Sequence, residues 1–226
     1  MRTIKRIWFF GLIILGLSQF ASAQTIPTPS PNKSGSAGTE QPKPEPQRIY
    51  QSACPAVLNG NVIASPLPPI VEGQCGERSP LQVSEIFSVS LSKPVILNCR
   101  MTSTLANWIE DLQQHRFDEG RPLLQRINVS TSYYCRRRNN APSGKISEHG
   151  FANALDMTGF EFRPDQTLTV EQDWESENAE TLKTMRDLAC KHFTTVLSPD
   201  ADPHHADHFH FDLGCHGKKC THRLCQ

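Results

Sequence analysis

Eight cysteines behind an export signal constrain this chain more than any other feature of its sequence. Within residues 1–23 of 226, three basic residues precede an apolar run over 7–17 and a small-residue stretch over 21–23. This pattern predicts a cleavable secretory signal peptide. An even number of cysteines in an oxidising compartment predicts up to four disulfides rather than thiolate chemistry. The candidates are Cys54, Cys75, Cys99, Cys135, Cys190, Cys215, Cys220 and Cys225.

Two alternatives remain open for these features. The apolar run could persist as a signal anchor, and the tail over 215–226 could form a Cys/His zinc knot. Its cysteines are separated by four residues, however, which differs from the tight C-x2-C pairs of zinc knots. Sequence alone selects none of the roughly one hundred possible disulfide pairings.

The charge balance shows no signature of nucleic-acid binding. The chain has 23 Lys+Arg and 23 Asp+Glu, and the signal peptide holds three of the basic residues. The mature chain therefore carries 20 basic and 23 acidic residues, a net charge near −3. We expect no nucleic-acid partner and, once the signal is removed, no membrane span.

The rest of the chain divides into a tether, one domain and a tail. Residues 24–47 are rich in proline, serine and glycine and predict a disordered tether, because they hold too few apolar side chains to offset the entropy of ordering. Residues 48–214 are expected to form the domain and 215–226 a cysteine-rich tail. Within 50–80 we expect irregular structure with short extended pieces, tied by Cys54 and Cys75.

Hydrophobic periodicity predicts both helices and strands in the domain. Helices are expected over 100–114 and, opened by Ser176, to about 192. Strands are expected over 127–134, 151–162, 166–170, 193–197 and 208–213. The irregular alternation of helices with closely spaced strands favours an α+β fold, a single compact domain with a small antiparallel sheet flanked by helices.

The densest cluster of chemically active side chains is HHADHFHFD, over 204–212. In a strand, successive side chains point to opposite faces, so His208 and His210 lie on one face and Phe209 and Phe211 on the other. The strand therefore presents an apolar face to the core and an imidazole face to a cleft.

A second segment, SEHGFANALD over 147–156, supplies the partners that a metal site in this cluster would need. His149 and Asp156 are seven residues apart, which alone is weak evidence. Together with His210 they offer two imidazoles and one carboxylate, a donor set that suits a single Zn²⁺ ion at the sheet.

These segments carry a family resemblance. The pattern S-E-H-G-x-A-N-A-L-D-x-x-G-F at 147–160, followed by H-x-D-H-F-H-F-D at 205–212, resembles the bacterial extensin-like C-terminal domain family. The resemblance runs from Cys54 to Asp212 and includes Y-C-R at 134–136, D-W at 173–174 and A-C-x-x-F-x-T-V-L-S-P at 189–199. That family is in turn similar to zinc D-alanyl-D-alanine carboxypeptidases, VanX-type dipeptidases and murein endopeptidases.

The resemblance implies an exported, periplasmic zinc peptidase that hydrolyses peptidoglycan stem peptides or cross-links. It implies the metal ligands His149, Asp156 and His210. It further implies that Asp207, one methylene shorter than a glutamate, is the acid/base carboxylate. The other implied catalytic residues are His208 and His205, which would hydrogen-bond substrate or oxyanion, and Arg136, which would steady the scissile carbonyl.

Other interpretations of these residues stay open. The domain could instead be a catalytically inactive zinc-containing module that binds cell wall or protein. His204 could take the place of His205, and Arg136 could belong, like Arg137 and Arg138, to a solvated basic loop. The remaining histidines are expected to be surface or packing residues: His115, His192, His216 and His222.

Overall fold

A computed structural model describes residues 53–115 and 123–226. The expected signal peptide and tether lie outside the described residues. The helices are α1 (Pro55–Leu58), α2 (Cys99–Gln114), α3 (Val170–Asp173) and α4 (Ala179–His192), with 3-10 turns at Arg138–Asn140, Glu148–Phe151 and Pro203–His205.

The strands form one large sheet and one small hairpin. They are β1 (Val62–Pro66), β2 (Ile70–Glu72), β3 (Cys75–Glu77), β4 (Leu81–Ile86), β5 (Val89–Leu97), β6 (Leu124–Thr131), β7 (Ala154–Phe162), β8 (Gln166–Thr169), β9 (Thr195–Leu197), β10 (Phe209–Asp212) and β11 (Leu224–Cys225).

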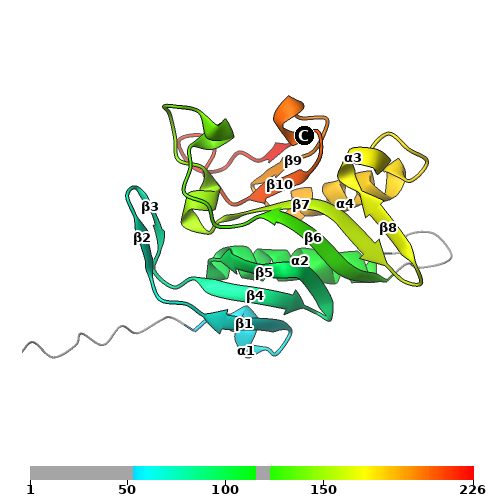
Figure 1. Ribbon diagram of the computed structural model, residues 1–226, viewed down its shortest axis with the longest axis horizontal. Helices are drawn as coiled ribbons and strands as arrows, with labels where there is room; N and C mark the ends of the chain where they lie inside the picture. Colours follow the sequence, from blue (N-terminus) through cyan, green and yellow to red (C-terminus); the bar gives the residue numbers. More distant parts are fainter. Residues whose placement is uncertain (1–52, 116–122) are drawn as a thin grey trace, which may run out of the picture. The chain divides into compact units, whose positions relative to one another are not determined.

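The large sheet has nine strands in the order β1-β4-β5-β6-β7-β10-β9-β11, with β8 pairing beside β7, and it is visible across Figure 1. The pairs β5–β6 and β9–β11 are parallel and the others are antiparallel. The α+β prediction is confirmed. The sheet is larger than expected, because β4, β5 and the tail strand β11 extend it. It is mixed because β5 pairs parallel with β6 and β11 pairs parallel with β9.

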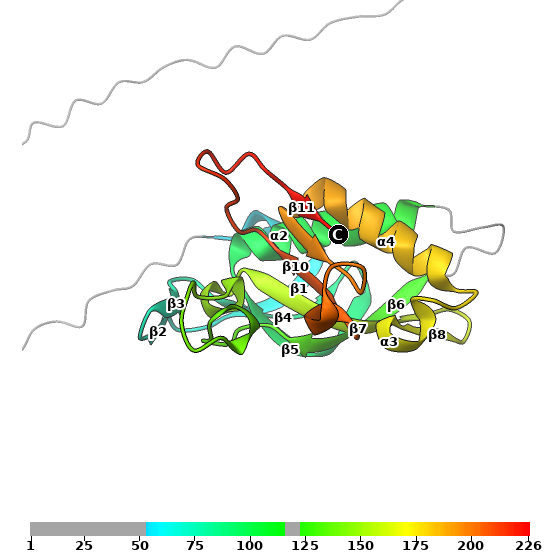
Figure 2. The same cartoon turned by 90° about the horizontal axis from the view of Figure 1, so that it is seen from above.

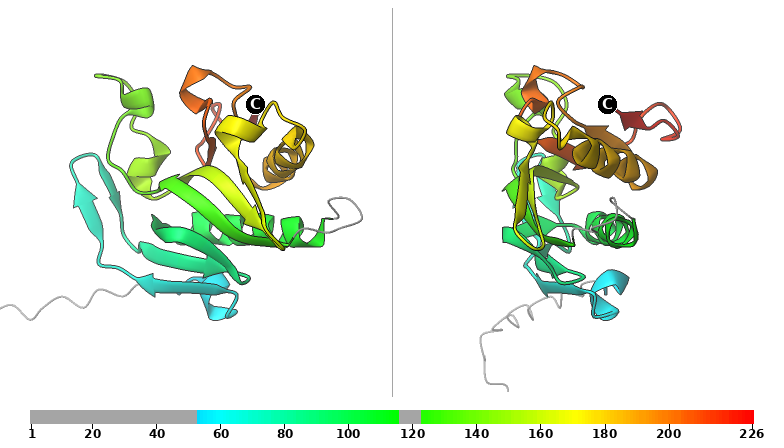
Figure 3. Two further views of the ribbon diagram at one scale, coloured as in Figure 1. Left: turned by 45° about the vertical axis from the view of Figure 1, so that its right-hand side comes forward. Right: turned by 90° about the vertical axis from the view of Figure 1, so that its right-hand side faces the viewer.

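Helices α2 and α4 cover one face of this sheet, as Figures 2 and 3 show. Trp108 of α2 lies fully buried between them and the strands: its ring meets Phe211 edge-on at 5.2 Å, and its Nε1 donates to the Met185 carbonyl of α4 at 3.1 Å. The predicted helix over 100–114 is confirmed, and its apolar stripe faces this core. Asn98 caps it by accepting a hydrogen bond from the Met101 amide at 2.7 Å.

The second helix begins later than predicted. Ser176 was expected to cap it, but α4 begins at Ala179. The Ser176 hydroxyl instead accepts from the Asn178 amide at 3.0 Å and donates to Asp173 at 3.1 Å, which closes the turn after α3. A local turn thus satisfies the hydroxyl, as serine favours.

The segment over 50–80 is more regular than expected within its described part, since it holds α1 and three strands. Its cysteines are not paired with each other. Cys54 bonds to Cys99 at the start of α2, and Cys75 of β3 bonds to Cys135. The β2–β3 hairpin is thereby tied to the loop that follows β6 (Figure 1).

All eight cysteines form disulfides, as predicted, and the zinc-knot alternative for the tail is excluded. Cys190 of α4 bonds to Cys225, and Cys215 bonds to Cys220. The tail is also part of the large sheet, because β11 adds to β9. Among the residues that the structure describes, no helix is long and apolar enough to cross a membrane.

Candidate metal centre

The site is built where β10 pairs with β7. In this antiparallel register His210 lies directly opposite Asp156, and Phe211 lies opposite Leu155. Alternation then places the imidazole and the carboxylate on the face away from α2, while Phe211 faces the core. The two predicted ligands are therefore brought together by strand pairing alone.

His149 reaches the same point from the 3-10 turn Glu148–Phe151 that precedes β7. Ser147 begins this turn, and its hydroxyl accepts from the His149 amide at 3.5 Å. Gly150 must lack a side chain, because a Cβ there would lie 2.7 Å from the Cys75 sulfur and 2.8 Å from an Ile146 methyl. The Cys75–Cys135 disulfide thus supports the turn that holds His149.

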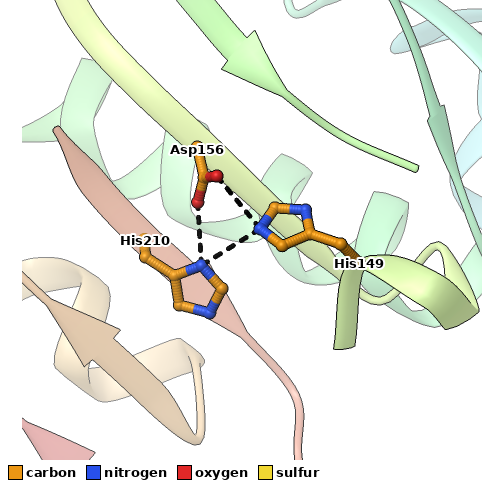
Figure 4. A group of neighbouring side chains, drawn as sticks. All are labelled: His149, Asp156 and His210. Carbon is orange, nitrogen blue, oxygen red and sulfur yellow. Dashed lines mark hydrogen bonds and ion pairs between the residues drawn. The ribbon is translucent and has the colours of Figure 1, made fainter. Parts of the chain in front are cut away.

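The donor atoms of the three predicted ligands converge (Figure 4). His210 Nδ1 lies 2.8 Å from Asp156 Oδ1, His149 Nε2 lies 3.1 Å from Asp156 Oδ2, and the two nitrogens are 3.2 Å apart. An ion with tetrahedral bonds near 2.0–2.1 Å separates its ligands by roughly 3.3 Å. The three residues therefore fit one Zn²⁺ ion, and all three are buried.

Each imidazole is also held by its other nitrogen. His149 Nδ1 lies 2.5 Å from the Ser132 carbonyl oxygen, so it donates and leaves Nε2 as the free donor atom. His210 Nε2 lies 2.9 Å from Asp212 Oδ2, which leaves Nδ1 for the ion. Metal-binding histidines are oriented in this way by carbonyl and carboxylate partners.

Electrostatic interactions favour the charged forms of both Asp156 and His210 in the metal-free chain. Burial opposes ionisation of Asp156, but hydrogen bonds with His149 and His210 outweigh it and hold the pKa of this carboxyl well below its usual range. Burial likewise disfavours a charged His210, yet its bonds to Asp156 and Asp212 raise the pKa of His210 to about 9 in the metal-free chain.

Of the three consecutive arginines, only Arg136 lies beside this group. Its Nη2 is 3.9 Å from Asp156 Oδ2. Arg137 donates to the Gly144 carbonyl on its own loop, and Arg138 pairs with Glu148 at 3.6 Å. Arg137 and Arg138 therefore fit the interpretation as a basic loop, whereas Arg136 belongs with the candidate metal ligands.

His205 faces the cluster, whereas His204 is exposed. The His205 ring lies 5.7 Å from that of His210, and its Nδ1 is 3.0 Å from Asp202 Oδ1. Burial lowers the pKa of His205 despite this acidic partner, so the ring is neutral near pH 7. Nδ1 then donates to Asp202, and Nε2 is left as an acceptor.

Asp207 and His208 form a hydrogen-bonded pair at the edge of the group. Asp207 Oδ1 accepts from His208 Nδ1 at 2.7 Å, and His208 Nε2 lies 3.8 Å from Asp156 Oδ1. The Asp207 side chain is 64% exposed. β10 begins only at Phe209, so 207 and 208 are free of strand alternation and the imidazole lies between the carboxylate and the ligands.

Two cavities open onto the group. One, of about 350 Å³, has Asp156, His210, Arg136, Asp207 and His208 among its lining residues. The other has a volume of about 100 Å³. It is lined in part by Arg138, Glu148, Thr195, Asp212 and His216. Both cavities share Arg136, Asn139, His205 and His210, so His210 is accessible from both, whereas Asp156 lines only the larger one.

The sequence analysis did not identify the residues on the Nε2 side of His210. Asp212 stands two positions after His210, and the same alternation that paired His208 with His210 would have found it. Thr195 lies opposite Asp212 on β9, which only strand register reveals. His216 was expected to be a surface or packing residue, yet its Nε2 lies 2.6 Å from the Thr195 hydroxyl.

The fold and the site define a disulfide-bonded α+β domain with a buried two-histidine, one-aspartate group on its sheet. Comparison with known protein families matches residues 52–226 to the family described as extensin-like protein C-terminus, and the chain belongs to that family. The match continues through the cysteine-rich tail. Neither the curated proteins nor the solved structures gave a significant match.

Proposed function

We propose that this protein is an exported zinc-dependent peptidase that hydrolyses peptide bonds in peptidoglycan stem peptides or cross-links. The observation that carries the proposal is the convergence of His149, Asp156 and His210. Three donors suit a catalytic zinc site, which keeps a further position open for water or substrate. The resemblance to zinc peptidases of the bacterial wall supplies the substrate class and the periplasmic location.

The surrounding residues have the chemistry that hydrolysis needs. Bound zinc would supply an activated water and a polarised carbonyl. The Asp207–His208 pair can accept a proton at His208 Nε2 and return it to the leaving amine, with Asp207 stabilising the imidazolium. Arg136, whose Nη2 lies 3.9 Å from Asp156 Oδ2, would supply a permanent positive charge to stabilise the carbonyl oxygen as it becomes negative.

His205 suits a different task from stabilising an oxyanion. With Nδ1–H donated to Asp202, its free nitrogen is a hydrogen-bond acceptor. It can orient an N–H group of the substrate or a water proton. We therefore assign the stabilisation of negative charge to Arg136 and the orientation of a donor to His205.

One observation favours a second candidate, a zinc-containing module that binds wall peptide without cleaving it. Asp207, the expected acid/base carboxylate, is largely exposed and is bonded to His208 rather than to a ligand. In such a module the ion would shape the binding surface only. The peptidase would need the Asp207–His208 pair for turnover, whereas the binding module would have no turnover at all.

Incubation of the purified protein with peptidoglycan sacculi, followed by separation of the muropeptides, tests the proposal. We expect new muropeptides that disappear with a chelator and return when Zn²⁺ is added back. His210→Ala should abolish the products, whereas His222→Ala, which changes an exposed tail histidine, should leave them unchanged.

The same assay separates the two candidates. A peptidase loses its products in His208→Gln while retaining zinc. Zinc-dependent retention on sacculi with no change in muropeptides, in wild type and His208→Gln alike, would establish the binding module instead. Absence of zinc from the wild-type protein would refute both.

A further inference from the structure

The cysteine-rich tail is connected to the metal centre by a chain of hydrogen bonds. His210 Nε2 lies 2.9 Å from Asp212 Oδ2, and Thr195 lies opposite Asp212 in the pairing of β9 with β10, where its hydroxyl can donate to the carboxylate. The Thr195 hydroxyl in turn lies 2.6 Å from His216 Nε2. We call the three supporting residues Asp212, Thr195 and His216 the Asp212 chain.

Donors and acceptors along the Asp212 chain can be assigned. The carboxylate of Asp212 only accepts, so His210 Nε2–H and the Thr195 hydroxyl both donate to it. The Thr195 hydrogen is thereby used, so His216 Nε2–H must donate to the Thr195 oxygen. Each link fixes the next, from the tail to the ligand nitrogen.

Asp212 is held in place by more than its contact with His210. It is buried, and its other oxygen accepts from the Gly214 amide at 2.8 Å. Gly214 permits this approach, since a Cβ there would lie 3.1 Å from both Asp212 Oδ1 and Glu148 Oε1.

His216, the last residue of the Asp212 chain, lies in a loop that is constrained by a disulfide and by strand pairing. His216 is half-buried and follows Cys215, whose disulfide to Cys220 closes the loop. The backbone of His216 also forms an antiparallel β-bridge with that of His222. The following strand, β11, pairs with β9, the strand that carries Thr195. The tail therefore presents His216 to Thr195 from a covalently closed structure.

We propose that Asp212, Thr195 and His216 are positioning residues through which the cysteine-rich tail orients His210 and sets the affinity of the site for zinc. The inference rests on the metal-binding part of the proposed function. It assigns no role in bond cleavage to these residues. The tail would thus contribute to metal binding in addition to its disulfides and its pairing with the sheet.

Zinc affinity of the full-length protein, measured by competition with a chromogenic chelator, tests the proposal without reference to hydrolysis. Asp212→Asn should weaken zinc binding by roughly 10- to 100-fold, the usual cost of losing such a partner. Thr195→Val and His216→Gln each remove one more distant hydrogen bond and should weaken it by roughly two- to tenfold. The visible spectrum of the Co²⁺-substituted protein should shift in the same order, since it reports ligand geometry.

Two matched variants distinguish positioning from a general loss of structure. Thr195→Ser keeps the hydroxyl and should retain wild-type affinity, and His222→Gln changes the neighbouring tail histidine outside the chain. Circular dichroism checks the fold of each variant, and if Asp212→Asn does not fold, Thr195→Val and His216→Gln carry the test. Wild-type affinity in the folded variants would overturn the inference while leaving the proposed peptidase intact. A wild-type protein without zinc affinity would overturn both.

Discussion

Along β10, Phe209 and Phe211 point to α2 and α4, whereas His210 and Asp212 point to the opposite face. The apolar pair is fully buried among aromatic rings, with Phe211 5.0 Å from Phe193 and Phe209 5.6 Å from Trp174. The polar pair is also buried, but its contacts are charged hydrogen bonds. One short strand thus anchors the core and positions the site.

The two faces should therefore affect two different measured quantities, the free energy of unfolding and the affinity for metal. Burial of the apolar side chains contributes mainly to the free energy of unfolding. The polar face contributes charge and geometry, and its residues are arranged around donor atoms rather than packed for volume. Substitutions on the two faces should therefore separate stability from metal binding.

The largest effect is expected from removing a ligand on the polar face. His210→Ala deletes one of three donors, so zinc binding and metal-dependent hydrolysis should fall to the level of the chelator-treated protein. Metal content after dialysis and the muropeptide assay measure this. Retention of stoichiometric zinc by His210→Ala would show that the ion binds elsewhere.

Removing a side chain from the apolar face should instead reduce stability. Phe211→Ala leaves a cavity beside Trp108 and should lower the free energy of unfolding by about 3–5 kcal/mol. Denaturant titration of the metal-free protein measures it. The folded fraction should still bind zinc, and a loss of affinity as great as that of His210→Ala would contradict the separation of the two faces.

Next in size is the effect of the arginine beside the group. If Arg136 stabilises developing negative charge, Arg136→Gln should reduce kcat by about 10²–10³-fold with little change in zinc affinity. Arg137→Gln, at the adjacent position but bonded to the Gly144 carbonyl, is the control and should leave kcat unchanged. Equal effects of the two substitutions would argue for a general electrostatic role.

The smallest effect concerns protons. The pKa of His210 is about 9 in the metal-free protein, so near pH 7.5 zinc must displace a proton from Nδ1. Binding should release about one proton, and affinity should rise with pH until about 9. Calorimetry in buffers of different ionisation enthalpy measures this release, and its absence would mean that His210 is already neutral.

The same pKa sets the sign of a stability effect in the metal-free protein. Because the folded-state pKa exceeds the ordinary value near 6.5, charged His210 stabilises the fold fully below about pH 6.5. That contribution is lost as the pH rises through about 9. His210→Gln should remove this dependence, which thermal unfolding across the pH range would show.

Much of this site could be predicted because its rules are local. Alternation in a strand placed His210 and Phe211 on opposite faces, and the donor types of His149 and Asp156 indicated a metal. Export-type context and an even cysteine count predicted up to four disulfides, and the structure has four. Helical periodicity found α2 to within one residue of its start.

The tertiary structure alone decided which distant segments meet. Cys54 and Cys75 bond to Cys99 and Cys135 rather than to each other, because disulfides follow proximity in the fold and many pairings satisfy the same sequence. Thr195 reaches Asp212 only through the register of β9 against β10, which depends on partners in both strands. The sequence therefore determined the donors of the site, and the sheet decided what holds them.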